Sequence, residues 1–249
     1  MPRPNLLDHP IVSERYFFPR PTPPLEPRVV TTRGGCELWC AVSDAASSKT
    51  VVHFHGNGEV VRDWQPLLGP FFVELGWSTV FVEYRGYGGS PGAPRLASML
   101  DDGEDVVRAL GLDPGQTVAF GRSVGSLYAV ELCKRLPLAG LILDSGVNDL
   151  VERLLLRVSP EELGVSDEEL CAEIGERFDQ SAKLQAFRGP TLLLHAGDDD
   201  LVSLAHAERN AAACHDGKLH VFPRGGHNAI FAMNQAEYLA QIRDFLAGL

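Results

Sequence analysis

The chain has 249 residues, 45% hydrophobic and 22% charged, a composition typical of a globular protein with an apolar core and not of a disordered chain. Its 33 acidic and 22 basic residues give a formal net charge of −11, which argues against binding to nucleic acid or to anionic membranes. The five cysteines are odd in number and scattered, which favours free thiols in a reducing compartment. There is no apolar leader and no apolar run of transmembrane length, so we expect a cytoplasmic protein.

The first 28 residues predict an extended arm. Residues 19–27 are rich in proline, which is excluded from helix interiors and favours extended backbone. We therefore expect residues 1–28 to lie as an arm on the surface of a single domain that spans residues 29–249.

From residue 29 onward, short apolar runs alternate with longer segments of helical character. Strands are predicted at Cys36–Val42, Thr50–His55, Ser78–Val82, Thr117–Phe120, Gly140–Asp144, Thr191–His195 and Lys218–Phe222. Helices are predicted over about 60–75, 98–110, 124–135 and 229–247. Strands that are apolar throughout and alternate with helices indicate an α/β fold, in which helices cover both faces of a mostly parallel central sheet.

One segment, residues 148–187, interrupts this alternation and predicts a small helical insertion, or lid, over the sheet. Leu170, Ile174 and Phe178 recur at a spacing of four, which places them on one face of a helix. This apolar stripe would either line a hydrophobic acyl pocket or anchor the insertion to the core. Residues 150–180 are net negative, which indicates a solvated outer face and weighs against strongly anionic substrates.

The strongest sign of chemistry is the run Gly121-Arg122-Ser123-Val124-Gly125, which matches the pattern Gly-x-Ser-x-Gly. It lies between a predicted strand and a predicted helix, where a sharp turn exposes the serine hydroxyl at the edge of the sheet. The alternative is an ordinary helix start capped by Ser123. The strand–turn–helix context makes Ser123 the candidate nucleophile.

A serine hydroxyl reacts only when a base takes its proton, and His227 is the candidate base. It follows the last predicted strand, and the preceding Gly225 and Gly226 allow the loop to place the imidazole ring. By contrast, His53 and His220 fall inside predicted strands.

The base in turn needs a carboxylate to orient it. Three adjacent aspartates, Asp198, Asp199 and Asp200, follow the strand Thr191–His195, and they give the chain order Ser, Asp, His that is expected when the serine lies on a strand–turn–helix junction of an α/β fold. We favour Asp200 and expect the other two to be turn residues. Asp144, at the end of the preceding strand, is an alternative.

The same chemistry needs N–H donors for a developing oxyanion. The loop that begins at His55 and Gly56 can direct the backbone N–H of Asn57 into the site, and the N–H of Val124 follows the nucleophile directly. No Gly-x-x-x-x-Gly-Lys-Ser/Thr pattern follows a strand, so a phosphate-binding loop is excluded.

Together these motifs resemble the α/β-hydrolase superfamily over nearly the whole chain from about residue 29. They are the segments 55–58, 83–90, 121–125, 197–200 and 225–227. The resemblance is strongest to the small-lidded branch of esterases, lipases and thioesterases. It implies that Asp200, three residues after Gly197, is the acid and that Asn57 donates to the oxyanion. The family usually has aspartate where this chain has Glu83.

The resemblance implies a serine hydrolase that cleaves carboxylic esters or thioesters through an acyl-enzyme, with no metal and no cofactor. A small ester or acyl compound would be its substrate, and neither nucleic acid nor a membrane span is expected. The alternatives are an amidase or peptidase with the same residues and a binding protein without turnover. The fold leaves the choice of substrate open.

Overall fold

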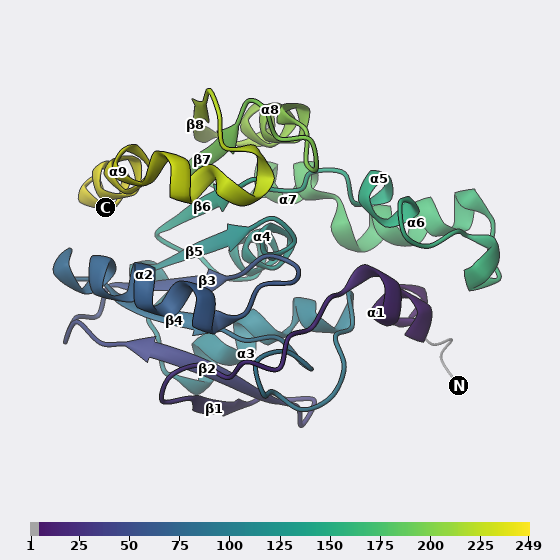
Figure 1. The fold of residues 1–249 in the computed structure, drawn as a ribbon, viewed down its shortest axis with the longest axis horizontal. Coiled ribbons are helices and arrows are strands. Elements are labelled where there is room, and N and C mark those ends of the chain that lie inside the picture. The colour runs from purple at the N-terminus through teal and green to yellow at the C-terminus, as the bar shows by residue number, and fades with distance from the viewer. Residues whose placement is uncertain (1–4) are drawn as a thin grey trace.

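The computed structural model describes residues 5–249, and an eight-stranded sheet forms its centre (Figure 1). The strands lie in the order β1-β2-β4-β3-β5-β6-β7-β8. β2 is antiparallel to both of its neighbours, and all other pairs are parallel. The strands are β1 (Arg28–Thr31), β2 (Glu37–Ser43), β3 (Thr50–Phe54), β4 (Ser78–Val82), β5 (Thr117–Arg122), β6 (Gly140–Asp144), β7 (Pro190–Ala196) and β8 (Asp216–Phe222).

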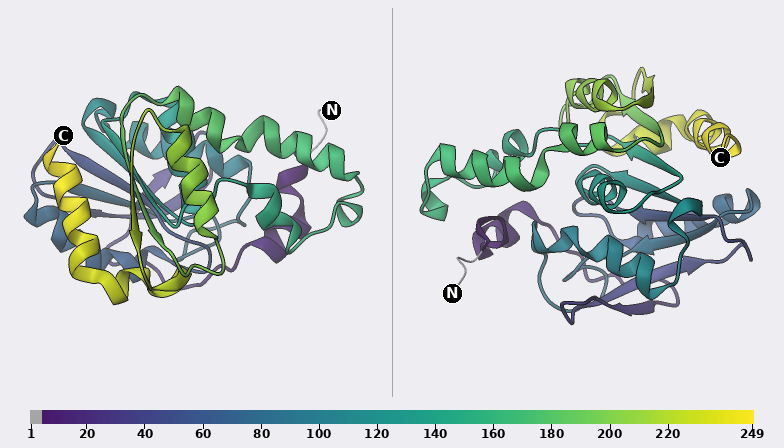
Figure 2. Two further views of the ribbon diagram at one scale, coloured as in Figure 1. Left: turned by 90° about the horizontal axis from the view of Figure 1, so that it is seen from above. Right: turned by 180° about the vertical axis from the view of Figure 1, so that it is seen from behind.

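Helices cover both faces of this sheet (Figure 2). One face packs against α2 (Val61–Glu74) and α9 (Gly226–Ala247). The other face packs against α3 (Asp102–Ala109), α4 (Gly125–Arg135), α7 (Gln180–Ala186) and α8 (Leu204–Ala213). Every residue of β3, β4, β5 and β6 is buried, as expected for strands covered on both faces.

The predicted α/β class and mostly parallel sheet are confirmed. The sequence analysis missed β1, a four-residue edge strand with three exposed residues, because so short and exposed a segment gives no apolar run. Within residues 5–249, no helix is both long and apolar enough to cross a membrane.

The N-terminal segment differs from the predicted extended arm. Residues Leu6–Asp8 form a 3₁₀ turn, η1, and Pro10–Tyr16 form helix α1. Pro10 occupies the first turn of α1, where its missing N–H costs nothing, and the side chain of His9 caps the N–H of Ile11 at 3.2 Å. Leu7 is fully buried, so this part of the segment belongs to the core. Residues 19–27 contain neither helix nor strand, and residues 1–4 of the predicted arm lie outside the described residues.

The insertion at 148–187 contains α5 (Leu150–Leu155), a 3₁₀ turn η4 (Glu161–Leu163), α6 (Asp167–Phe178) and α7. In Figure 1, α5 and α6 lie near α1 at the end of the molecule away from the C-terminus, and α6 contacts η1. Leu170, Ile174 and Phe178 are buried in the core. The apolar stripe therefore anchors the insertion and does not line the cavity beside Ser123.

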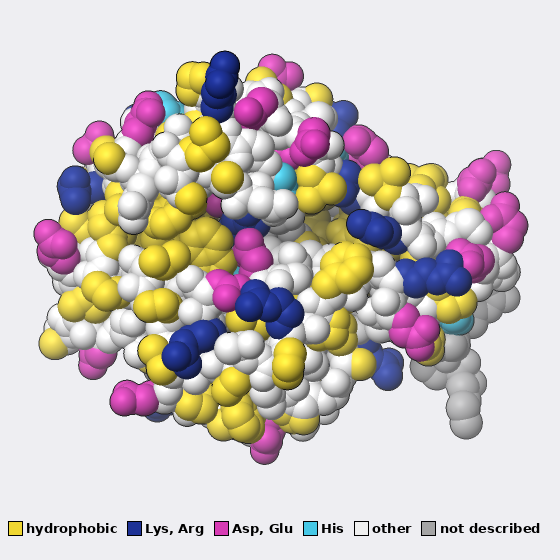
Figure 3. Space-filling view, in the orientation of Figure 1, with side chains coloured by type: hydrophobic (Ala, Val, Ile, Leu, Met, Phe, Trp, Pro, Cys, Tyr) yellow, Lys and Arg dark blue, Asp and Glu magenta, His cyan; other side chains and the backbone are white. Residues whose placement is uncertain are grey.

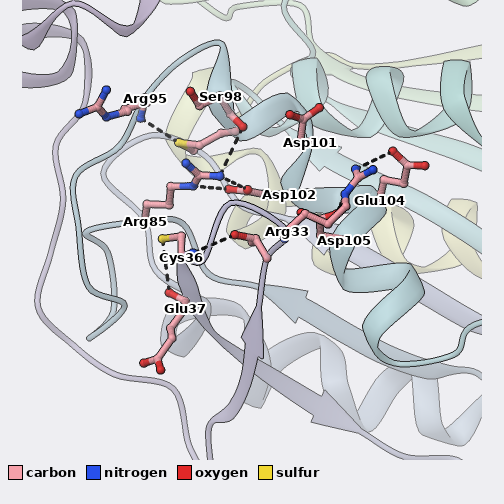
Figure 4. A network of polar contacts seen from close by, with 12 residues as sticks. Arg33, Cys36, Glu37, Arg85, Arg95, Ser98, Asp101, Asp102, Glu104 and Asp105 are labelled. Carbon is pink, nitrogen blue, oxygen red and sulfur yellow. Dashed lines mark hydrogen bonds and ion pairs between the residues drawn. The ribbon is translucent and has the colours of Figure 1, made fainter.

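Ion pairs fix the turn between β1 and β2, and the loop after β4, to the start of α3 (Figure 4). Arg33 binds Glu104 at 3.0 Å and also binds Asp105. Arg85 donates from Nε to Asp102 at 2.9 Å. These contacts tie the antiparallel edge of the sheet and the carboxyl end of β4 to α3.

Candidate functional site

Ser123 occupies the sharp turn between β5 and α4. Its φ of +51° lies in the left-handed region, which is strained for a residue with a side chain. The two flanking glycines allow this turn. A Cβ on Gly121 would lie 2.6 Å from the carbonyl oxygen of Gly125, and a Cβ on Gly125 would lie 2.2 Å from that of Phe54 in β3. The Gly-x-Ser-x-Gly pattern thus reflects close packing of α4 against two strands.

A hydrogen-bonded chain runs from Ser123 through His227 to Asp199. The Oγ of Ser123 lies 2.9 Å from Nε2 of His227, and Nδ1 of His227 lies 2.8 Å from Oδ2 of Asp199. Since an ionised carboxylate can only accept, Nδ1 carries the hydrogen and Nε2 is left to accept the serine proton. His227 is 5% exposed and Ser123 8% exposed, so the contacts are shielded from water but open to the cavity.

The preference for Asp200 is corrected by this geometry. Asp199, not Asp200, contacts His227, because its other oxygen accepts the N–H groups of Leu201 at 2.9 Å and Val202 at 2.8 Å. This local turn directs the Asp199 carboxylate inward, whereas Asp200 is exposed. Asp198 is also separate, since it accepts the N–H of Gly226 at 2.7 Å.

The environment of Asp199 favours its charged form. Burial opposes ionisation, but the hydrogen bond and charge of His227 and the two backbone N–H groups hold the pKa of Asp199 below its usual value. The arrangement fixes both the orientation and the tautomer of His227.

The alternative acid, Asp144, has other partners. Its Oδ2 lies 3.4 Å from Nε of Arg122 and accepts the hydroxyl of Tyr238 at 2.9 Å. Arg122 is itself buried and binds Glu59 at 2.6 Å. Glu59 in turn accepts the N–H of Gly56 at 2.7 Å. One buried arginine therefore links the loop after β3 to the end of β6.

Ser123, His227, Asn57 and Val124 line a single cavity of about 230 Å³. Among residues 5–249, neither the backbone N–H of Asn57 nor that of Val124 has a hydrogen-bond acceptor. The two residues that carry these free N–H groups therefore line the same cavity as Ser123.

The Asn57 loop rests on a buried pair formed by His55 and Glu83. Nδ1 of His55 lies 2.8 Å from the carbonyl oxygen of Gly56, and Nε2 lies 2.8 Å from Glu83. Glu83 also accepts the N–H of Val61 at 3.0 Å, as a carboxylate would. When Glu83 is ionised, both ring nitrogens of His55 donate, which the protonated ring allows. Burial opposes this charge, but Glu83 raises the pKa of His55.

This pair also orients the peptide between Gly56 and Asn57. The peptide is trans, so its N–H points away from its C=O. By donating to the Gly56 carbonyl, His55 fixes the direction of the Asn57 N–H.

Known proteins resemble this chain in sequence and in fold. A family model described as serine aminopeptidase S33 matches residues 45–159. An uncharacterized protein of Mycobacterium tuberculosis is 29% identical, over 88% of this chain and 78% of its own length. Alpha/beta hydrolase domain-containing protein 17C of Xenopus tropicalis is 26% identical, over 87% of this chain and 68% of its own length. The Pyrococcus furiosus esterase Pf2001 superposes with a TM-score of 0.71 at 19% identity, covering 89% of this chain and 91% of the esterase.

The chain has the α/β-hydrolase fold of this esterase. In this fold the structure brings together Ser123, His227, Asn57 and Val124, the residues that the sequence analysis proposed for the site, and it adds buried residues that the sequence analysis missed. Arg122 could have indicated these supporting residues from the sequence. A charged residue in a motif between two buried elements needs a partner that compensates its charge. Among the described residues, no three His, Cys, Asp or Glu side chains gather as metal ligands would.

Proposed function

We propose that this α/β-hydrolase cleaves carboxylic esters or thioesters through Ser123, His227 and Asp199. The observation that carries the proposal is the chain of contacts at 2.9 and 2.8 Å, which ends at Ser123 in a cavity that Asn57 and Val124 also line. A nucleophile, a base, an orienting carboxylate and oxyanion donors are the parts that acyl transfer needs.

In the proposed mechanism, Ser123 Oγ attacks the acyl carbon while Nε2 of His227 takes its proton. The N–H groups of Asn57 and Val124 stabilise the negative oxygen of the tetrahedral intermediate. His227 then protonates the leaving alcohol or thiol, which leaves an acyl group on Ser123. Water, deprotonated by His227, releases the acid and restores the serine. Asp199 stabilises the imidazolium in both halves of the reaction.

A second candidate, hydrolysis of amides or peptides, is favoured by the match to the serine aminopeptidase family model. The same residues would attack an amide carbonyl, and protonation by His227 would be needed for the poorer amine leaving group. Amide and peptide substrates form the comparison arm of the assay.

The five cysteines are free thiols, which suits a reducing compartment such as the cytoplasm.

The test is labelling with a fluorophosphonate probe, followed by intact mass measurement. We expect one covalent adduct on the wild type, no adduct on Ser123→Ala, and an adduct on Ser48→Ala, in which an exposed serine is removed instead. Labelling of folded Ser123→Ala, or no labelling of folded wild type, would contradict an activated serine at this position.

A substrate panel then distinguishes the two candidates. Because the cavity of about 230 Å³ is smaller than the roughly 300–1,000 Å³ of drug-sized ligand pockets, short acyl groups should react faster than long ones. Faster turnover of acetyl and butanoyl esters than of aminoacyl anilides would favour the esterase, and the reverse order the peptidase.

A further inference from the structure

The cavity beside Ser123 has a basic wall. Besides His227 and the buried Arg122, two arginines line it, Arg153 in α5 and Arg157 just after α5. No aspartate or glutamate is among the described residues that line this cavity. This is unexpected in a chain whose formal net charge is −11.

The three arginines differ in whether their charge is already neutralised. Arg122 is paired with both Glu59 and Asp144 and has no charge to spare for a ligand. Within residues 5–249, neither Arg153 nor Arg157 forms an ion pair with a carboxylate. Their charges therefore remain available at the wall of the cavity.

Each of these two arginines is held in place by an uncharged partner. Arg153 donates to the carbonyl oxygen of Leu201, next to the turn that positions Asp199, and Leu201 also lines the cavity. A guanidinium has five N–H donors, so this bond leaves donors free. The guanidinium of Arg157 lies 5.3 Å from the ring centre of Phe18, another lining residue. Packing on an aromatic face orients the guanidinium and leaves its edge open to a ligand.

The acidic residues of the insertion do not offset this charge at the cavity. Those that follow Arg157 in the insertion lie on η4, on α6 or, for Asp179, between α6 and α7, and none of them lines the cavity. The sequence analysis expected the net-negative insertion to weigh against anionic substrates. Because these acidic side chains lie outside the cavity, they give no reason to exclude an anionic substrate there. In the space-filling view, basic side chains lie beside hydrophobic ones between the positions of α5 and α1 (Figure 3).

We infer that Arg153 and Arg157 form a subsite for an anionic group, a carboxylate or a phosphate, carried by the ester whose carbonyl reaches Ser123. The inference rests on the proposed function and names the substrate class of the same site. A guanidinium binds both anions through paired N–H donors, so the chemistry is shared, and the substituent can lie on the acyl or the alcohol side.

The test compares charged esters with neutral partners that contain the same reacting ester bond. One pair places a carboxylate on the acyl side: monomethyl adipate against methyl adipamate, in which a carboxamide replaces the acid. The other places a phosphate on the alcohol side: 1-butanoylglycerol 3-phosphate against 1-butanoylglycerol. For at least one pair, we expect kcat/KM for the charged ester to exceed that of the neutral one by about 10- to 100-fold, as charge-assisted hydrogen bonds allow.

Variants of Arg153 and Arg157 test whether these two residues cause the preference for charged esters. Arg153→Gln with Arg157→Gln should bring the charged-to-neutral ratio close to one, and Arg153→Lys with Arg157→Lys should keep part of it. Arg62→Gln, on the exposed side of α2 and away from the cavity, should leave the ratio unchanged. Because Arg157 is exposed, the preference should also fall as salt rises from about 0.05 to 0.5 M.

The outcomes separate this inference from the proposed function. Loss of the preference in the double glutamine variant, with fluorophosphonate labelling retained, supports the subsite. If labelling is normal and the charged and neutral esters of both pairs react equally, the subsite is wrong while the hydrolase proposal stands. A preference that survives the double glutamine variant also overturns it. Absence of both labelling and turnover would contradict the hydrolase proposal itself.

Discussion

Arg122 donates a hydrogen bond from Nη2 to the backbone carbonyl oxygen of His227 at 2.7 Å. Through Nη1 the same guanidinium binds Glu59 at 2.6 Å, and Glu59 accepts the N–H of Gly56. The residue before the candidate nucleophile thus joins the loop of the candidate base to the loop of the candidate oxyanion donor. One buried guanidinium therefore connects three segments that are far apart in the chain.

Replacing Arg122 should therefore cost both stability and activity. Arg122→Gln leaves the buried carboxylate of Asp144 and the partly buried carboxylate of Glu59 without their cation, and removing one partner of a buried pair costs about 3–5 kcal/mol. We expect the urea midpoint of unfolding to fall accordingly. The exposed Arg62→Gln should change the free energy of unfolding by less than about 0.5 kcal/mol. Equal effects of the two substitutions would show that the Arg122 network is not important for the fold.

The contact between His227 and Asp199 makes a prediction about two neighbouring aspartates. Asp199→Asn should lower kcat by about 10⁴-fold, because an amide can donate to Nδ1 and so favour the wrong tautomer of His227. Asp200→Asn, at an exposed position, should leave kcat within about twofold of the wild type. Ester hydrolysis by the two variants, each checked for folding by circular dichroism, measures this difference. A larger loss in the Asp200 variant would reinstate the original preference.

Two helical glycines provide a matched test of packing at the serine turn. A Cβ on Gly125 would lie 2.2 Å from the carbonyl oxygen of Phe54, whereas a Cβ on Gly175 in α6 meets nothing within 4 Å. Gly125→Ala should destabilise the protein by about 1–3 kcal/mol or more through overpacking. Gly175→Ala should stabilise it by about 0.5–1 kcal/mol through helix propensity. Thermal unfolding of both variants measures the two shifts, and shifts of the same sign would refute the close approach of α4 to β3.

The buried pair of His55 and Glu83 makes stability depend on pH. Glu83 raises the pKa of His55 in the folded state, so folding favours the protonated ring. The resulting stabilisation is complete below the unfolded pKa of about 6.5 and is lost as pH rises through the higher folded pKa. The difference in free energy of unfolding between wild type and His55→Gln, measured in urea from pH 6 to 9, should therefore shrink with rising pH. A difference that grows with pH would mean that the ring is neutral when folded.

Much of the fold is determined by local patterns. β4 and β6 begin and end at the predicted residues, because continuous apolar runs between turn residues need no information from distant parts of the chain. The helical boundaries of α2 and α4 differ from prediction by about one residue. The N-terminal segment was less predictable, since the proline-rich stretch at 19–27 gives no indication that α1 precedes it and packs into the core.

The sequence by itself determined the α/β alternation, the serine turn with its two glycines, and a histidine placed after the last strand. Only the tertiary structure decided which of three adjacent aspartates faces His227, because that depends on the turn made with the N–H groups of Leu201 and Val202. It also decided the partners of Arg122 and the basic wall formed by Arg153 and Arg157. These features join residues far apart in the chain, and the free energy of such contacts depends on distance, burial and orientation that no local pattern encodes.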